Sequence, residues 1–496
     1  MAMLEEMVEG SLAADGPRVV AALSVRMGGV DPLGLRQINF GLMDRVFPSI
    51  NNVARHARPY VLMAWAWRRV RHILERGKHT GATDQAMRDF VDRIEALYAW
   101  SQFLNDRNTD LPGGQAMREL LDADGYEFGG PDWLIRRDVR RYSTGLISPL
   151  NYGPTLQTMG WLARADQGVG VFRTPTTLDP LLDEFEALMA DELEHPVFCS
   201  FDPVMVARSD AQRWGKLWEL SEPLESERVG MLARLGGDLA PKERRAGVEL
   251  VRAAIADRGN EQAELGAVRA RMADLPEVWA AGEAPAAAAE WRTVQVRQAF
   301  RLALEALFYW TVDTLTDRPL HSGPLADRFL EDLGPANLPE TSGEWLLREV
   351  ERDNPTVHLN RLQTALRAKS GVADAIISAL RHSLREAPDK AAEFEAPDRL
   401  PLAWAARDAR GWASLTPREF LIRVLENWIM AQHTYWSVGR GLADARSRGK
   451  TILRLRIVMD EGGWTQTPGA VLGSAPEATP DRLETVVSLL KECGGL

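Results

Sequence analysis

Hydrophobic residues recur along most of the chain at the three- and four-residue spacing of amphipathic helices. The stretch 84–104 is one example, since its apolar side chains form a single stripe on a helix. Residues 284–315 form the longest run of this kind. The run 357–386 has the same spacing with a glycine near its middle, which predicts one helix or a helical pair with a break near Gly371. The pattern therefore predicts a mainly α fold built from multi-helix bundle domains.

The end of the chain has a different pattern. Residues 452–458 alternate between apolar and polar side chains, as a half-buried strand does. A Gly-Gly turn follows, and 464–467 are expected to return as the partner strand. A last amphipathic helix is predicted after the Thr-Pro pair at 479–480. We therefore expect a small C-terminal β-hairpin and helix, winged-helix-like or partner-binding in character.

Breaks rich in proline and glycine divide the helical pattern into segments. One lies at 128–131 and another within 319–341. A chain of 496 residues is long enough for two to four domains. We predict an N-terminal helical domain at 1–128, a central helical domain at 129–335, a third helical segment at 336–449 and the C-terminal module at 450–496.

The stretch 39–79 has the most distinctive pattern. An amphipathic helix should end before Pro48, because the residue preceding a proline is disfavoured in the helical region. Asn51 or Asn52 is expected to cap the next helix. Every residue from 60 to 67 is apolar, which predicts a helical segment buried on all sides. The charged residues that follow, from 68 to 78, are basic apart from Glu75.

Two arginine clusters stand out in a chain whose net charge is −11. Cations near a helix C-terminus interact favourably with the helix dipole, so a structural role is one interpretation of the first cluster. The other is an anion-binding surface held in place by a buried helix. The arginines of the second cluster lie one helical turn apart, where like charges repel unless carboxylates or a phosphate lie nearby. The sequence does not decide between carboxylates and a phosphate as their partner. The candidate nucleic-acid- or anion-binding residues are Arg68, Arg69, Arg71 and Arg76 in the first cluster, and Arg136, Arg137, Arg140 and Arg141 in the second.

The same stretch resembles a known motif. Its residues are similar to the N-terminal motif of a family of helical bacterial proteins of unassigned activity, found in phage-defence islands and often beside helicase or nuclease genes. The resemblance covers about 45 of the 496 residues. It implies a bacterial, antiviral setting and work in a protein complex, and it supplies no catalytic residues. The matching positions are Phe40-Gly41-Leu42, Phe47-Pro48-Ser49, Asn52-Val53, Arg58, Tyr60 and Trp65.

Composition narrows the class of protein. Apolar residues make up 45% and charged residues 26%, as in ordinary globular proteins. The acidic balance argues against a general nucleic-acid coat and leaves a local basic groove open. Cys199 and Cys493 cannot form a disulfide framework, and no apolar run approaches the roughly 20 residues that cross a bilayer. The first ten residues are acidic and do not have the basic and apolar stretches expected of a signal peptide. We expect a cytoplasmic protein with no membrane partner.

The sequence contains no standard catalytic signature. It lacks G-x-S-x-G, H-E-x-x-H, the Walker lysine loop and paired C-x-x-C. Glu192 and His195 have the Glu-x-x-His spacing of di-iron bundles, but no second copy exists, so a chance match on the acidic helix 179–195 is expected. His433 lies on an aromatic face, which predicts a hydrogen-bonded core histidine rather than a catalytic one. We predict no catalytic residue, no metal ligand and no cofactor.

Functions from different classes fit these features. The first is a non-enzymatic helical scaffold or adaptor subunit of a bacterial, anti-phage complex, whose arginine clusters contact nucleic acid or an acidic protein partner. The alternative is a metal-dependent nuclease or hydrolase that combines dispersed carboxylates with His195. A third, a DNA-reading C-terminal module, is disfavoured because Asp481 and Glu484 make its would-be recognition helix acidic.

Overall fold

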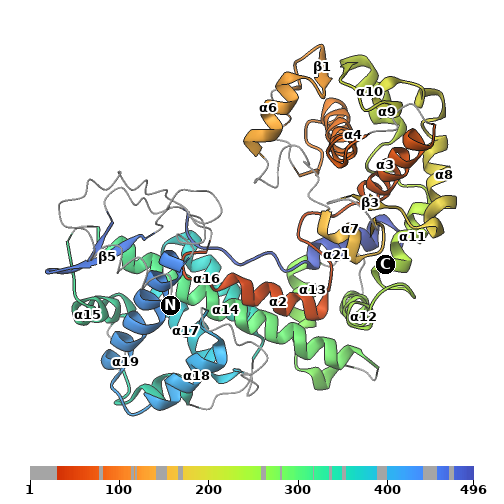
Figure 1. Cartoon of the computed structure of the whole chain (residues 1–496). Coiled ribbons are helices and arrows are strands. Elements are labelled where there is room, and N and C mark those ends of the chain that lie inside the picture. Colours follow the sequence, from red (N-terminus) through yellow and green to blue (C-terminus); the bar gives the residue numbers. More distant parts are fainter. Residues whose placement is uncertain are drawn as a thin grey trace, which may run out of the picture. The chain divides into compact units, whose positions relative to one another are not determined.

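The computed structural model describes most of the chain, and its elements are drawn in Figure 1. For residues 136–140 and 153–154 only the backbone is described. The described residues are 31–76, 82–112, 117, 120–140, 153–165, 171–257, 264–279, 282–316, 318–334, 338–348, 353–387, 399–439, 455–467 and 474–496.

The described part of the chain is mainly α-helical. Its strands form only two-stranded antiparallel pairs. The predicted mainly α fold with a small C-terminal hairpin is therefore confirmed. Within the described ranges, no helix combines the length and apolar character needed to span a bilayer.

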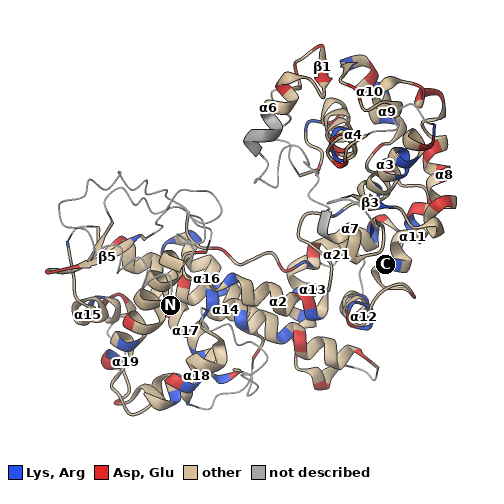
Figure 2. Ribbon diagram, viewed as in Figure 1, with Lys and Arg blue, Asp and Glu red and all other residues tan. Residues whose placement is uncertain are grey.

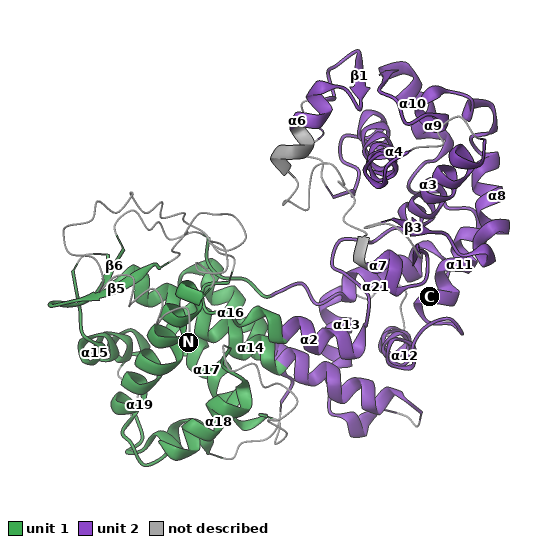
Figure 3. Ribbon diagram, viewed as in Figure 1, with its two compact units in different colours: residues 1–38, 296–352, 358–478 green, residues 39–295, 353–357, 479–496 purple. Residues whose placement is uncertain are grey.

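The chain forms two compact units, coloured separately in Figure 3. Each unit is assembled from separated stretches of sequence, so the units cut across the predicted segments 1–128, 129–335, 336–449 and 450–496. The C-terminal hairpin belongs to unit 1 and the last helix to unit 2. Unit 1 comprises 1–38, 296–352 and 358–478, and unit 2 comprises 39–295, 353–357 and 479–496.

Unit 2 is built around α3 (Arg58–Glu75), which packs on α4, α7, α8, α9 and β3. Trp65 in the middle of α3 is fully buried, and its ring contacts those of Phe185, Phe198 and Trp218. The other elements are α2 (Arg36–Val46, from residue 39), α4 (Asp84–Asn105), β1 (Gly125–Phe128), α6 (Pro131–Arg140), α7 (Gly153–Thr158), β2 (Ala163–Arg164), β3 (Phe172–Arg173), η2 (Thr176–Leu178), α8 (Asp179–Ala187), η3 (Ala190–Glu192), α9 (Pro196–Cys199), β4 (Val204–Ala207), α10 (Arg208–Leu217), α11 (Glu225–Leu235), α12 (Lys242–Asp257), α13 (Leu265–Met272), η4 (Pro276–Val278), the start of α14 and α21 (Leu483–Glu492).

The start of α3 differs from the prediction. The side chain of Asn51 accepts hydrogen bonds from the backbone N–H groups two and three residues on, which closes a turn instead of capping a helix. The helix begins at Arg58 after Ala57, whose N–H donates to the carboxylate of Glu492. The predicted burial of 60–67 is confirmed, and it continues beyond that apolar run into the arginines.

Unit 1 packs around the C-terminal part of α14 (Ala284–Thr314), whose predicted core side chains Phe300, Leu304 and Phe308 are buried. The predicted cap of α19 is confirmed, since Thr416 accepts from the Glu419 N–H and Glu419 accepts from the Thr416 N–H. The other elements are the first residues of α2, α15 (Ser322–Leu333), η5 (Gly343–Leu347), α16 (Pro355–Ala368, from residue 358), α17 (Val372–Arg385), α18 (Leu402–Gly411), α19 (Pro417–Arg423), η7 (Val424–Ala431), β5 (Ile457–Asp460) and β6 (Gly463–Gln466).

The first strand of the C-terminal hairpin begins at Ile457 within the described residues, and positions 452–454 of the predicted strand lie outside them. β5 and β6 pair antiparallel, with Ile457 opposite Gln466 and Asp460 opposite Gly463. Gly463 has a φ of 119°, a conformation that favours glycine over other residues. Trp464 also exchanges two backbone hydrogen bonds with Leu320. These bonds attach the hairpin to the rest of unit 1.

A buried ion pair joins α3 to α11 inside unit 2. The side chains of Arg58 and Glu227 are 1% and 0% exposed, and Arg58 Nη2 lies 2.8 Å from Glu227 Oε2. Arg58 also donates to the carbonyl of Glu222. Burial raises the pKa of Glu227 above its usual range, and the Arg58 charge opposes that rise. Arg58 and the Leu224 N–H, which donates to the same carboxylate, therefore offset part of the cost of burying it.

We expect Arg58→Met to lower the unfolding free energy by about 3–5 kcal/mol, because it leaves a buried carboxylate without its cation. The double variant Arg58→Met with Glu227→Met removes both charges and should recover much of that loss. Urea denaturation followed by tryptophan fluorescence measures both. A single variant as stable as wild type would contradict the assigned role of the pair.

Candidate functional site

Arg68 and Arg69, at the centre of the first predicted cluster, are buried. Arg68 donates to Asp183 Oδ1 at 2.6 Å and to Glu186 Oε2 at 2.5 Å, and Arg69 donates to Glu186 Oε1 at 3.0 Å. Arg69 also donates to the carbonyl of Phe198. The acidic helix α8 therefore supplies the anions that these two guanidinium groups contact, and their role in the fold is internal. Figure 2 shows basic and acidic positions mixed over the helices of each unit.

Arg71 and Arg76 lie further along the same segment and remain exposed. The Arg71 side chain is 43% exposed and lies 3.8 Å from carboxylate oxygens of Glu75 and Asp179. Arg76 is 51% exposed and lies 3.3 Å from Glu194 Oε1. Pairs this exposed are screened by solvent and hold their partners weakly. Anion binding by the first cluster stays a prediction, for which Arg71 and Arg76 are the accessible members.

The structure does not describe the side chains of the second cluster. Arg136, Arg137 and Arg140 lie on α6, of which the backbone alone is described at these positions, and Arg141 lies outside the described residues. Anion binding by this cluster therefore stays a prediction.

Glu192 and His195, the chance metal-site match, have separate partners. Glu192 receives two hydrogen bonds from Arg213, which lower the pKa of its carboxyl group. His195 Nδ1 accepts from the Val197 N–H and thereby caps α9, while its ring packs against Trp214. Neither residue belongs to a group of potential metal ligands in the described part of the chain.

His433 is a buried, hydrogen-bonded core residue, as predicted. Its Nδ1 lies 2.9 Å from the carbonyl oxygen of Pro32, and its Nε2 accepts from the Arg456 N–H. The Nδ1 atom therefore carries the proton of a neutral ring. The ring packs on Phe308, and burial lowers the pKa of His433 to about 4.

The candidate site lies on the helix pair α16 and α17. The two helices are joined at Gly371, whose φ of 64° is a left-handed conformation that glycine adopts at low cost. The predicted break near Gly371 is thus confirmed, and of the two alternatives the structure has the helical pair. The rings of His358 on α16 and His382 on α17 stack with their centroids 4.5 Å apart and 20° between their planes.

Contacts along this helix pair orient His358. Asp374, Ser378 and His382 lie one turn apart on α17, so they share a face. The hydroxyl of Ser378 lies 2.9 Å from His358 Nδ1, and Arg361 forms an ion pair with Asp374 one turn away. A partner on one ring nitrogen fixes the direction of the other, so Nε2 is the atom through which His358 would bind a metal ion.

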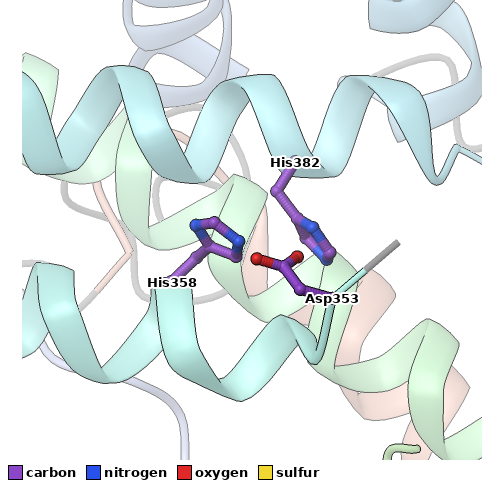
Figure 4. Close-up of side chains that lie close together, drawn as sticks. All are labelled: Asp353, His358 and His382. Carbon is purple, nitrogen blue, oxygen red and sulfur yellow. The ribbon is translucent and has the colours of Figure 1, made fainter. Parts of the chain in front are cut away.

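A carboxylate completes the group. Asp353 lies in the turn that leads into α16, five positions before His358 in the same continuous stretch of chain. Figure 4 shows its carboxylate beside both imidazole rings, and one potential ligand atom from each residue lies within 4.8 Å of the other two. Asp353 is exposed, His358 is half-buried and His382 is buried. The group therefore extends from the interior to the solvent, which gives an ion access to it.

These three residues have the donor atoms of a transition-metal site. Two imidazole nitrogens and one carboxylate oxygen form the ligand set of many catalytic zinc sites and of non-haem iron sites. No short spacing connects these ligands in the sequence, because they come from two helices and the segment that precedes α16. The signal that was present is the placement of His358 and His382 at similar distances on either side of Gly371.

Comparisons with protein-family models, curated proteins and solved structures found no match for this chain. A proposal for its function therefore depends on the residues and their geometry.

The low pKa of His433 predicts a loss of stability in acid. The folded-state pKa is about 4, whereas an unfolded histidine has a pKa of about 6.5. As the pH falls below 6.5, the unfolded chain binds a proton that the folded chain excludes, so stability present at pH 7 is lost towards pH 4. The loss is about 3 kcal/mol.

A His433→Gln variant has no such proton to bind. Urea unfolding of both proteins between pH 7 and pH 4 should show the stability advantage of wild type shrinking by about 3 kcal/mol. A difference that does not change with pH would contradict the assignment.

Proposed function

We propose that the protein is a metal-dependent hydrolase whose divalent transition-metal ion is bound by Asp353, His358 and His382. The observation that supports this proposal is the placement of two imidazoles and one carboxylate with ligand atoms within 4.8 Å of one another. Bound ligands lie about 2.0–2.2 Å from a zinc ion, so small side-chain movements bring such a group into coordination.

The three ligands among the described residues favour a catalytic role over a structural one. Structural zinc sites have four protein ligands, whereas catalytic sites have three and keep a position for water. An ion held by Asp353, His358 and His382 would supply a water activated for the hydrolysis of an ester, amide or phosphate, because a bound metal ion lowers the pKa of its water. This proposal is a form of the metal-dependent hydrolase that the sequence offered as an alternative, with His358 and His382 as the ligands in place of His195.

We expect the purified protein to bind one equivalent of Zn²⁺ or Mn²⁺, and His358→Ala and His382→Ala to weaken that binding by at least tenfold, because each removes one of three ligands. Isothermal titration calorimetry measures the affinity. His321→Ala is the matched control, since it removes an exposed histidine from the same unit.

Hydrolysis is tested separately with ester and phosphodiester substrates, with and without the metal ion. Activity that requires metal and is lost in His358→Ala supports the complete proposal. Metal binding without hydrolysis would remove the enzymatic part, and equal metal affinity in all variants would remove the site itself.

We retain as a second proposal the scaffold or adaptor subunit of a bacterial defence complex. The exposure of Arg71 and Arg76 supports it. Arg71→Glu with Arg76→Glu should abolish salt-dependent binding to nucleic acid or an acidic partner, and a filter-binding or pull-down assay at two salt concentrations measures the change. Arg107→Glu, another exposed arginine of unit 2, is the control. Binding unchanged by the double substitution would exclude Arg71 and Arg76 as the contact.

A further inference from the structure

Four arginines surround one glutamate inside unit 1. Arg301 Nη1 donates to Glu305 Oε2 at 2.6 Å, and Arg36 Nη2 lies 3.6 Å from the same oxygen. Glu305 also attracts Arg297, which lies one turn before Arg301 on α14, and the half-buried Arg456. All five residues belong to unit 1, and we call them the Glu305 cluster.

Positive charge exceeds negative charge in the Glu305 cluster. Among the described residues, the one further carboxylate that acts on Arg297 is that of Asp31. Its two oxygens accept the backbone N–H groups of Leu35 and Arg36, so they are engaged at the start of α2. Four guanidinium groups against two carboxylates leave an excess of two positive charges.

The cluster also contains more buried donors than acceptors. Arg297 is 2% exposed, and its one described hydrogen bond runs from Nη2 to the carbonyl of Leu400. Among the described residues, no acceptor lies within hydrogen-bond reach of Arg297 Nε, Arg297 Nη1, Arg301 Nε or Arg36 Nε. The one acceptor without a donor here is Glu305 Oε1. Folded proteins seldom leave buried guanidinium donors in this state, because desolvation without compensation costs several kcal/mol.

Among the described residues, the buried side chains of Arg68, Arg93 and Arg234 each leave a single Nε atom without an acceptor, whereas Arg297 leaves two nitrogens. Arg244 in unit 2 is 1% exposed, and its Nε, Nη1 and Nη2 atoms all donate to backbone carbonyls. Arg297 differs in having two nitrogens without an acceptor and a second arginine beside it. Burial, followed by repulsion from Arg301, lowers the pKa of Arg297 to about 9. Its charge is therefore held at an energetic cost that a bound anion would offset.

We propose that the Glu305 cluster binds a phosphate group, through the unpaired donors of Arg36, Arg297 and Arg301. A phosphate carries up to two negative charges and several acceptor oxygens, which match the charge excess and the unpaired donors. The group belongs to a free phosphate ion or to a phosphate monoester. This inference goes beyond the hydrolase proposal, and zinc binding at His358 and His382 does not bear on it.

Differential scanning calorimetry of the full chain tests the proposal with two probes, inorganic phosphate and phenyl phosphate, against sodium chloride at equal ionic strength. At 100 times its dissociation constant, phosphate should raise the unfolding temperature of unit 1 by about 5 °C. A response to inorganic phosphate alone assigns a free ion, and a larger response to phenyl phosphate assigns a monoester. Both support the site.

Two variants separate phosphate binding from a structural role. Arg297→Met keeps the buried volume and should abolish the phosphate response, while Arg36→Gln, at a partly exposed position, should weaken it about tenfold. Arg244→Met is the matched control, because it should lower stability and leave the response intact. If neither probe raises the unfolding temperature of the wild-type protein, the proposal is wrong. In that case, an Arg297→Met protein more stable than wild type would show that water alone satisfies the unpaired donors.

Discussion

The buried guanidinium group is the interaction on which most of this fold depends. Arg244 connects α12 to the end of α11 and to the turn at Pro48 by donating to three carbonyls. Arg69 and Arg93 likewise donate to carbonyls of the irregular segment around α9. The carbonyls at helix ends lack intrahelical partners, and the five N–H donors of arginine satisfy several of them at once. Lysine has no such fork, and only seven of the 59 basic residues are lysine.

This use of arginine changes how clusters of positive charge in the sequence should be interpreted. Arg68 and Arg69 appear beside Arg71 in one basic run, yet burial separates the first two from the third. The carboxylates that meet them come from α8, more than a hundred residues later in the chain. The Glu305 cluster shows the opposite case, since its arginines come from separate segments and several of their nitrogens have no acceptor among the described residues.

The metal-site candidate follows from the same principle of distant residues brought together. A helix pair with a tight turn at Gly371 places positions on α16 opposite positions on α17, and Ser378 holds one nitrogen of the His358 ring. Ser378 thus orients the His358 ring, which would lower the reorganisation that binding of a metal ion requires. His433 has the reverse environment, because both of its nitrogens have backbone partners and its ring packs in an aromatic core.

The sequence by itself determined the helical class, the burial of 60–67, the cap at Thr416 and the break at Gly371. These features depend on local periodicity, capping and backbone preference, which neighbouring residues specify. Only the tertiary structure decided that Arg68 and Arg69 lie inside, that Asn51 closes a turn, and that Asp353 meets His358 and His382. Each of these depends on which distant segments pack together, and the long-range burial that selects those partners leaves no fixed spacing in the chain.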